Sequence, residues 1–405
     1  MSKTCEECKH KSELYWCNTC NAKRLQQNFK NWTSEWIPYD RFYDIEYIAK
    51  GGFGKVYRAN WIDGNINHWG NKNQNWKRPY PNMDVALKSL NNSKNVRLEF
   101  INEITSHHKI YDGSYSSIIR LYGITQDPDT KNYMMVLEYA ENGSLRNYLD
   151  TNVKLSWLDK IRNLYWIANG LNVIHSNELI HRDLHIGNIL HTHGIFIFGN
   201  AYITDMGLCK PADYIATENT KIVIYVMALI MYKVFSGLPP YHDVSHNQDL
   251  AVKICQGLRP RFDIKVPQLI VHLIKRCLDA IQLNRPTANE VWDILYQWRF
   301  NFEDQTELQR QIKEADEIND NNLQTSSAPS TSIALTSYKT HSEAIYISRL
   351  LNFNNLPEPK NSVDYYKQYD NIISTEYSEN LHIDISRLKI NENDQNDESK
   401  SEENF

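Results

Sequence analysis

Residues 42–48 are β-prone and largely alternate between polar and apolar side chains, and residues 84–90 form a mainly apolar stretch; each pattern predicts a β-strand. The segment 98–104 is predicted to be helical, and its spacing places Glu99 and Glu103 on one face. The region from residue 42 to residue 104 is therefore predicted to be rich in strands, with a helix after the second strand.

Further along, a helix is predicted from Tyr225 to Phe235, inside the longest apolar run, residues 222–232. That run has eleven residues, whereas a membrane-spanning helix needs about 20, so we expect no membrane span. An Asn- and Trp-rich insertion between Asn60 and Asp84 is expected to form a surface loop.

The composition changes after residue 302. Residues 303–320 are charged and helix-prone, which predicts one exposed helix. Residues 344–351 form a short apolar island that could dock on the folded domain or on a partner. Residues 391–405 are acidic and expected to be disordered, and the whole stretch 301–405 is interpreted as a mostly disordered tail.

Hydrophobic residues make up 41 % of the chain, enough for a sizeable core. The formal net charge of -5 provides no strong basic field, so we expect no nucleic-acid partner. The first residues contain no apolar segment typical of a secretion signal. These features predict an intracellular, cytoplasmic protein in a reducing compartment, where structural disulfides are rare.

Four cysteines near the start have the spacing C-x2-C-x8-C-x2-C, namely Cys5, Cys8, Cys17 and Cys20. Two such pairs can present four thiolates to one tetrahedral Zn²⁺, which predicts a small zinc-knuckle-like segment over residues 1–24. The alternative is a set of reduced thiols in a flexible tail. The cysteines at 209, 255 and 277 are far apart and are interpreted as ordinary buried or half-buried residues.

A glycine-rich turn follows the first predicted strand and contains Gly51, Gly52 and Gly54. Glycines allow backbone amides to approach a phosphate closely, although a bulged turn in any sheet could look the same. In the next strand, Lys88 is a charge among apolar residues, and such a charge is costly unless it is paired. Glu103 follows fifteen residues later on the predicted helix and is a candidate partner.

These features, together with three ordered motifs, resemble the eukaryotic protein kinase family, of the tyrosine-kinase-like sort. The motifs are Val85-Ala86-Leu87-Lys88, His181-Arg182-Asp183-Leu184-His185-Ile186-Gly187-Asn188 and Asp205-Met206-Gly207. The resemblance covers residues 41–300. It implies an α+β, two-lobed fold with a small β-rich N-lobe (about 41–140) and a larger helical C-lobe (about 141–300).

The resemblance also implies an activity: transfer of the γ-phosphoryl group of ATP, with Mg²⁺, to serine, threonine or tyrosine hydroxyls of a protein substrate in signalling. It assigns Asp183 as the proton acceptor, Lys88 and its partner Glu103 to the phosphates, and Asn188 and Asp205 to Mg²⁺. The residues that it implies around ATP are Ile48, Gly51, Gly52, Gly54, Val56, Ala86, Lys88, Leu137, Glu138 and Ala140.

Several positions depart from the family pattern. Ala49 replaces the first glycine of the loop, Met206 replaces Phe in D-F-G, and His185 stands where serine/threonine kinases usually carry Lys. The acceptor residue is therefore ambiguous. Met is flexible and apolar, and it could still pack on His181.

The largest departure is a short activation segment without A-P-E, because only eighteen positions separate Asp205 from Val223, which aligns with the family's anchoring Asp. Arg285 loses its family partner, so it is expected to be solvated or paired elsewhere. Arg182 could bind a phosphate on Thr217 or Thr220. Two hypotheses follow: an active protein kinase, or an ATP-binding pseudokinase that acts as a scaffold.

Overall fold

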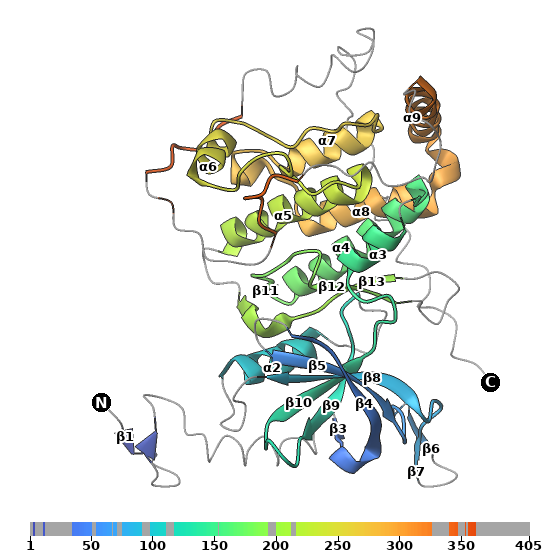
Figure 1. Cartoon of the computed structure of the whole chain (residues 1–405), viewed down its shortest axis with the longest axis vertical. Coiled ribbons are helices and arrows are strands. Elements are labelled where there is room, and N and C mark those ends of the chain that lie inside the picture. The colour runs from blue at the N-terminus through green and yellow to red at the C-terminus, as the bar shows by residue number, and fades with distance from the viewer. Residues whose placement is uncertain are drawn as a thin grey trace, which may run out of the picture.

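The structure is a computed structural model, and it describes residues 3–4, 11–12, 35–50, 54–66, 68–70, 75–90, 98–110, 117–152, 154–192, 200–211, 216–325, 340–346, 353 and 355–361. A β-sheet lobe lies below a larger helical lobe, and a single strand-to-helix connection near residue 140 joins them (Figure 1). The predicted α+β, two-lobed fold is confirmed.

The N-lobe is built on a sheet of six strands among the described residues, in the order β3-β9-β10-β8-β5-β4. Its neighbours are antiparallel except for β3 and β9. The strands are β3 (Glu35–Trp36), β4 (Phe42–Lys50), β5 (Gly54–Trp61), β8 (Met83–Leu90), β9 (Leu121–Gln126) and β10 (Tyr133–Glu138), with 3-10 helix η2 (Tyr39–Arg41) before β4.

Alternation along β8 divides its residues between two layers. Val85 and Leu87 are fully buried in one cluster with Trp61 and Val136. The opposite face carries Ala86 and Lys88 and is covered by helix α2 (Leu98–Ile110). The predicted strand and helix are thus confirmed, because burial on one face fixes the register of an alternating strand.

The insertion after β5 contains more structure than a loop. Strands β6 (His68–Gly70) and β7 (Asn75–Lys77) pair as a two-stranded hairpin, with Trp69 opposite Trp76. The expectation of a loop rested on the many Asn residues of the insertion, whereas its aromatic residues favour paired strands. A second short pair, β1 (Lys3–Thr4) and β2 (Lys11–Ser12), lies near the start of the chain.

The C-lobe packs its helices around one large hydrophobic cluster. Its helices are α3 (Leu145–Thr151), α4 (Trp157–Ser176), α5 (Ala216–Ser236), α6 (Gln248–Cys255), α7 (Gln268–Cys277) and α8 (Ala288–Phe300), with 3-10 helix η4 (Gln282–Asn284) before α8. Ser144 caps α3 as expected, since its hydroxyl accepts from the Asn147 amide. Thr287 and Glu290 form a capping box on α8.

Four short strands and one 3-10 helix lie between α4 and α5 among the described residues. They are β11 (Leu179–Ile180), β12 (Ile189–Thr192), β13 (Asn200–Ile203) and β14 (Lys210–Pro211), with 3-10 helix η3 (Met206–Leu208). Strand β12 pairs with β13, and β11 pairs with β14. These two pairings bring the segments around residues 183, 188 and 205 to the lobe boundary.

Helix α5 begins at Ala216, nine residues before the predicted start at Tyr225. The apolar run marks where the helix becomes buried, as at Val223 and Met227. Its polar first turns carry no hydrophobic period, so the sequence pattern placed the start of the helix too late.

The chain beyond residue 300 is also partly ordered. After 3-10 helix η5 (Phe302–Asp304), helix α9 (Thr306–Thr325) lies against the C-lobe and buries Leu308 and Ala315 completely. The predicted helix is therefore present, but one of its faces is buried. Among the described residues, no helix is long and apolar enough to cross a membrane.

Candidate functional site

The pairing of β8 with both neighbours defines one side of the candidate site. Val56 of β5 lies opposite Lys88, and Leu137 of β10 lies opposite Ala86. Since residues two apart share a face, these four side chains lie on the same surface of the sheet. Ile48, at the end of β4, is 46 % exposed near the glycine turn.

Lys88 is tied to two carboxylates from different parts of the chain. Its Nζ lies 2.7 Å from Glu103 Oε1 on α2 and 3.1 Å from Asp205 Oδ1 of the C-lobe. Lys88 and Glu103 are 8 % and 2 % exposed, so this is a buried network. The charge in the middle of the strand is therefore paired, as its cost requires.

The protonation state of Lys88 follows from two opposing effects. Burial lowers the pKa of the Lys88 ammonium, but attraction to Glu103 and then to Asp205 outweighs burial and raises this pKa above its usual value. Lys88 therefore stays positively charged at neutral pH. A fixed cation between two lobes is suited to binding phosphate oxygens.

His181 holds the start of the loop formed by residues 181–188, which the resemblance makes the candidate catalytic loop. The Asp183 amide donates to His181 Nδ1 at 3.3 Å, so the ring proton lies on Nε2, which donates to Thr204 O at 2.9 Å. Burial lowers the pKa of His181, which keeps the ring neutral in this arrangement. The loop is thereby joined to the strand that leads to Asp205.

Asn188 and His185 surround the Asp183 carboxylate. Asn188 Nδ2 donates to Asp183 O at 2.9 Å and lies 3.4 Å from Asp183 Oδ2. His185 Nδ1 accepts from the Gly187 amide, so Nε2 carries the proton and lies 3.8 Å from Asp183 Oδ2. Burial lowers the pKa of His185, which favours its neutral form.

Strand pairing brings Asp205 to the same place. Ile189 lies opposite Ile203, and the Thr204 amide donates to Asn188 O at 2.9 Å. Asp205 itself has φ of 63°, a left-handed conformation that is uncommon outside glycine and frequent at functional sites. A Cβ on Gly207 would lie 3.2 Å from Glu103 Oε2, so a side chain there would have to displace the Glu103 carboxylate by a few tenths of an ångström. Met206 is fully buried.

The connection between the lobes follows β10. Leu137 is 5 % exposed beneath this connection, and the Glu138 amide donates to Arg120 O at 2.9 Å. Ala140 O accepts from the Gly143 amide, which forms a tight turn before α3. The segment from Glu138 to Ala140 therefore lies beside the sheet face that carries Ala86 and Leu137.

Other predicted site residues are placed differently. Gly51, Gly52 and the four N-terminal cysteines lie outside the described residues, whereas Gly54 is buried at the start of β5. Arg182 is exposed, and Thr217 and Thr220 lie in the first turns of α5. In the described part of the chain, no three His, Cys, Asp or Glu side chains gather as a metal cluster. Cys209 and Cys277 are buried and Cys255 is half-buried, as expected.

The sequence left open whether Arg285 is solvated or paired elsewhere, and the structure shows that it is paired. Its guanidinium donates to Asp279 O at 2.7 Å and to Lys221 O at 3.0 Å, and it lies 4.9 Å from the centre of the Tyr225 ring. Lys221 Nζ in turn donates to Arg285 O. No sequence pattern pointed to Lys221, because one polar residue at the start of a helix has no distinctive signal.

Comparison with known proteins shows what this domain is similar to. Residues 44–229 match the family model described as "Protein tyrosine and serine/threonine kinase". A putative serine/threonine-protein kinase/receptor of Acanthamoeba polyphaga mimivirus is 27 % identical over 280 residues, covering 64 % of this chain and 15 % of that protein. Tyrosine-protein kinase SPK-1 of Girardia tigrina is 27 % identical over 268 residues, covering 59 % of this chain and 50 % of its own length.

An Aurora kinase of Schizosaccharomyces pombe is 25 % identical over 277 residues, covering 62 % of this chain and 70 % of its own. The matched part of the chain thus spans 15 % of the length of the mimivirus protein and 50 % of the length of the Girardia protein. Their names include both serine/threonine and tyrosine kinases, so the comparisons do not select an acceptor. The ordered motifs and the two-lobed fold agree with the family match, so residues 44–229 are similar to protein kinase domains in sequence and in architecture.

Proposed function

We propose that the protein is an ATP-dependent kinase that transfers the γ-phosphoryl group to serine, threonine or tyrosine hydroxyls of proteins. The observation that carries this proposal is the assembled network of Lys88 with Glu103 and Asp205, beside Asp183 and Asn188. Phosphoryl transfer depends mainly on such positioning and on charge neutralisation. The network joins residues from both lobes in one arrangement.

Each group has a role that suits its surroundings. Lys88, which stays charged, would hold phosphate oxygens, and Glu103 would keep it in place. Asp183 would accept the proton of the substrate hydroxyl. Its carboxylate is oriented by Asn188, and His185 also lies beside it.

The residues also fit Mg²⁺, which prefers oxygen ligands. Asp205 offers a carboxylate, and Asn188 offers Oδ1 because its Nδ2 is committed to Asp183 O. When bound, the cation would neutralise phosphate charge. For adenine, the face formed by Val56, Ala86 and Leu137 offers an apolar surface. The Glu138 amide is already used by Arg120, so Glu138 would contribute its carbonyl and Ala140 its amide.

The pseudokinase alternative rests on the short activation segment, and the assembled catalytic groups do not favour it. Three finer expectations remain proposals: Zn²⁺ bound by Cys5, Cys8, Cys17 and Cys20, a phosphate on Thr217 or Thr220 bound by Arg182, and an intracellular role in signalling. Of these, the zinc proposal is tested most directly by measuring bound metal in the wild type and in a Cys5→Ser variant.

The kinase proposal is tested by transfer of labelled γ-phosphate from Mg·ATP to a mixture of serine-, threonine- and tyrosine-containing peptides. Asp183→Ala is expected to lower transfer by at least about a hundredfold, because the general base is lost, while ATP still raises the melting temperature. Asp249→Ala, an exposed residue in the first turn of α6, is the matched control. Equal transfer by wild type and Asp183→Ala would contradict the proposal. ATP binding without transfer by the wild type would support the pseudokinase.

A further inference from the structure

A segment of the tail, residues 340–346, lies on the C-lobe beside the loop that follows α5, and we name it the tail strap (Figure 1). The His341 amide donates to His242 O at 2.8 Å, and the His246 amide donates to Glu343 O at 3.2 Å. Ser245 Oγ also donates to Glu343 Oε2 at 2.6 Å. The strap is thus held along its length by backbone and side-chain hydrogen bonds.

The strap ends on an aromatic anchor, Tyr346. Arg146 Nη2 donates to Tyr346 O at 3.1 Å, and the Tyr346 hydroxyl donates to Pro240 O at 3.1 Å. The His246 ring meets the Tyr346 ring edge to face, with centroids 4.8 Å apart. Because this hydroxyl is bonded to Pro240, Tyr346 is not placed as an acceptor at Asp183.

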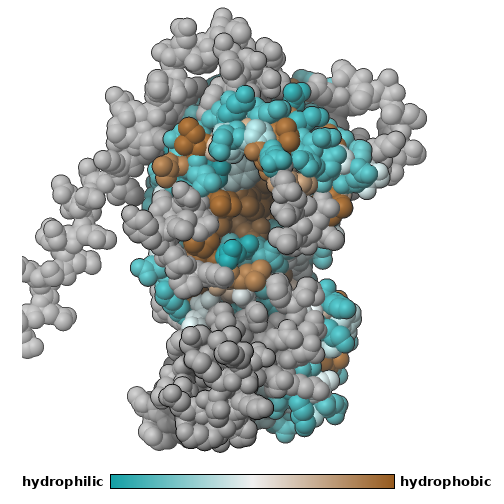
Figure 2. Space-filling model, turned by 90° about the vertical axis from the view of Figure 1, so that its left-hand side faces the viewer, coloured by the Kyte–Doolittle hydropathy of each residue, from teal (hydrophilic) through white to brown (hydrophobic). Residues whose placement is uncertain are grey.

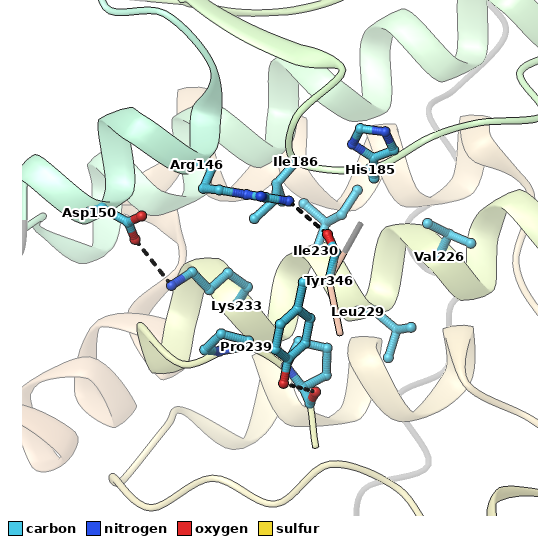
Figure 3. Close-up of a pocket in the computed structure, with 11 residues that line it drawn as sticks. Arg146, Asp150, His185, Ile186, Val226, Leu229, Ile230, Lys233, Pro239 and Tyr346 are labelled. Carbon is cyan, nitrogen blue, oxygen red and sulfur yellow. Dashed lines mark hydrogen bonds and ion pairs between the residues drawn. The ribbon is translucent and has the colours of Figure 1, made fainter. Parts of the chain in front are cut away.

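Tyr346 forms one wall of a cavity of about 330 Å³ in the C-lobe (Figure 3). That volume is within the range of ligand pockets, roughly 300–1,000 Å³. The other walls come from the start of α3, the catalytic loop, α5 and the turn after it. The described lining residues are Arg146, Asp150, His185, Ile186, Val226, Leu229, Ile230, Lys233, Pro239, Pro240 and Tyr346. A hydrophobic hollow is visible on this side of the helical lobe (Figure 2).

The chemistry of the walls selects an apolar occupant. Val226, Leu229 and Ile230 come from successive turns of one face of α5, opposite Ile186. The two cations at the end of the cavity are already bonded: Lys233 to Asp150 at 3.5 Å and to Gly237 O, and Arg146 to Tyr346 O. A charged ligand would have to compete with these partners, whereas an aliphatic or aromatic group would not.

The cavity is continuous with the catalytic loop. His185 lines it, and His185 Nε2 lies 3.8 Å from Asp183 Oδ2. An extended peptide advances about 3.3 Å per residue, so a substrate with its hydroxyl at Asp183 would bring a side chain roughly one to three positions away to the cavity.

We propose that the tail strap completes a peptide-binding cavity, which takes a large apolar side chain of the protein substrate close to the phosphorylated hydroxyl. The inference rests on the proposed kinase function and adds a substrate preference to it. The strap acts as a wall and not as a plug, because a cavity of this size stays open while the strap is docked. The hydroxyl and the carbonyl of Tyr346 both form hydrogen bonds that hold this residue at the edge of the cavity.

The test uses the full-length protein and labelled peptides that contain Ala at the acceptor position, with Phe or Asp at each of the three positions on either side. Binding is followed by fluorescence anisotropy, which requires no transfer. One Phe position is expected to bind at least tenfold more tightly than the same position with Asp, since burial of one aromatic side chain supplies that much. Leu229→Trp, which fills the cavity, is expected to reduce this preference to less than threefold.

The strap is tested by Tyr346→Ala, with Ile345→Ala as the matched control, because Ile345 is exposed on the same strap and does not line the cavity. Tyr346→Ala should lose the Phe preference, Ile345→Ala should keep it, and both should melt within a few degrees of wild type. No preference in the wild type overturns the inference, as does tighter peptide binding by Tyr346→Ala, which would make the strap a plug. A Phe preference in this binding test, combined with no phosphate transfer to the hydroxyl-containing peptides of the kinase assay, leaves the cavity supported and contradicts only the kinase proposal.

Discussion

His107 is a buried, uncharged histidine one helical turn beyond Glu103 on α2. It is 4 % exposed, its Nε2 has no hydrogen-bond partner among the described residues, and burial lowers its pKa to about 3. The unfolded chain, with a pKa near 6.5, therefore takes up this proton first as the pH falls. The stability that neutral His107 contributes is complete above about pH 6.5 and is lost as the pH falls toward 3.

We predict that the free energy of unfolding of wild type falls by about 2 kcal/mol more between pH 7 and pH 5 than that of a His107→Leu variant. Urea unfolding at both pH values measures the difference, and the other buried histidines cancel because both proteins contain them. Equal losses in the two proteins would show that His107 is not buried in its neutral form.

At the residue scale, the sequence is informative where one residue creates a requirement that another must meet. Lys88 within an apolar strand demands a counter-charge, so the amino-acid sequence alone indicates Glu103 as a candidate partner. His107 and Lys221 create no such requirement in the sequence, because a polar residue on a helix is equally compatible with solvent or with a buried contact. Their roles depend on which helix face is covered, and only the fold determines that.

Helix α5 shows the same limit at the element scale. Its buried centre was predicted from the apolar run, but the first nine residues were assigned to the activation segment. This earlier start places Lys221 beside Arg285, and Lys221 together with Tyr225 replaces the glutamate partner that the missing A-P-E would have supplied. The short segment is therefore compensated by helix and backbone groups.

Arg285→Ala is predicted to lower the free energy of unfolding by about 2–4 kcal/mol, because Asp279 O and Lys221 O lose their donor inside the C-lobe. The matched control is Arg261→Ala, whose side chain is exposed and which should change stability by less than about 0.5 kcal/mol. Chemical denaturation measures both. Similar effects of the two substitutions would mean that the Arg285 contacts contribute no more than a surface position.

At the scale of the whole molecule, the two lobes were predictable because the motifs of residues 85–88, 181–188 and 205–207 occur in a fixed order. The docking of residues beyond 300 was not predictable from the sequence. Much of it depends on backbone hydrogen bonds, such as that from the His341 amide to His242 O, and backbone groups are the same in every residue except proline. The apolar island at 344–351 indicated that a contact was possible, but only the structure places Tyr346 against Pro240 and Arg146.

Helix α9 extends the folded domain beyond the boundary expected at residue 300, and we predict that it contributes substantially to stability. Leu308 is completely buried, and Gln311 accepts from the Leu269 amide at 3.0 Å. In the full-length protein, Leu308→Ala should therefore cost about 2–4 kcal/mol of unfolding free energy, through lost burial and an unfilled cavity. Lys313→Ala, on the exposed face of the same helix, should cost less than about 0.5 kcal/mol. If both substitutions leave the unfolding midpoint unchanged, α9 is an appendage, because a helix that stabilises the C-lobe cannot lose its buried leucine without loss of stability.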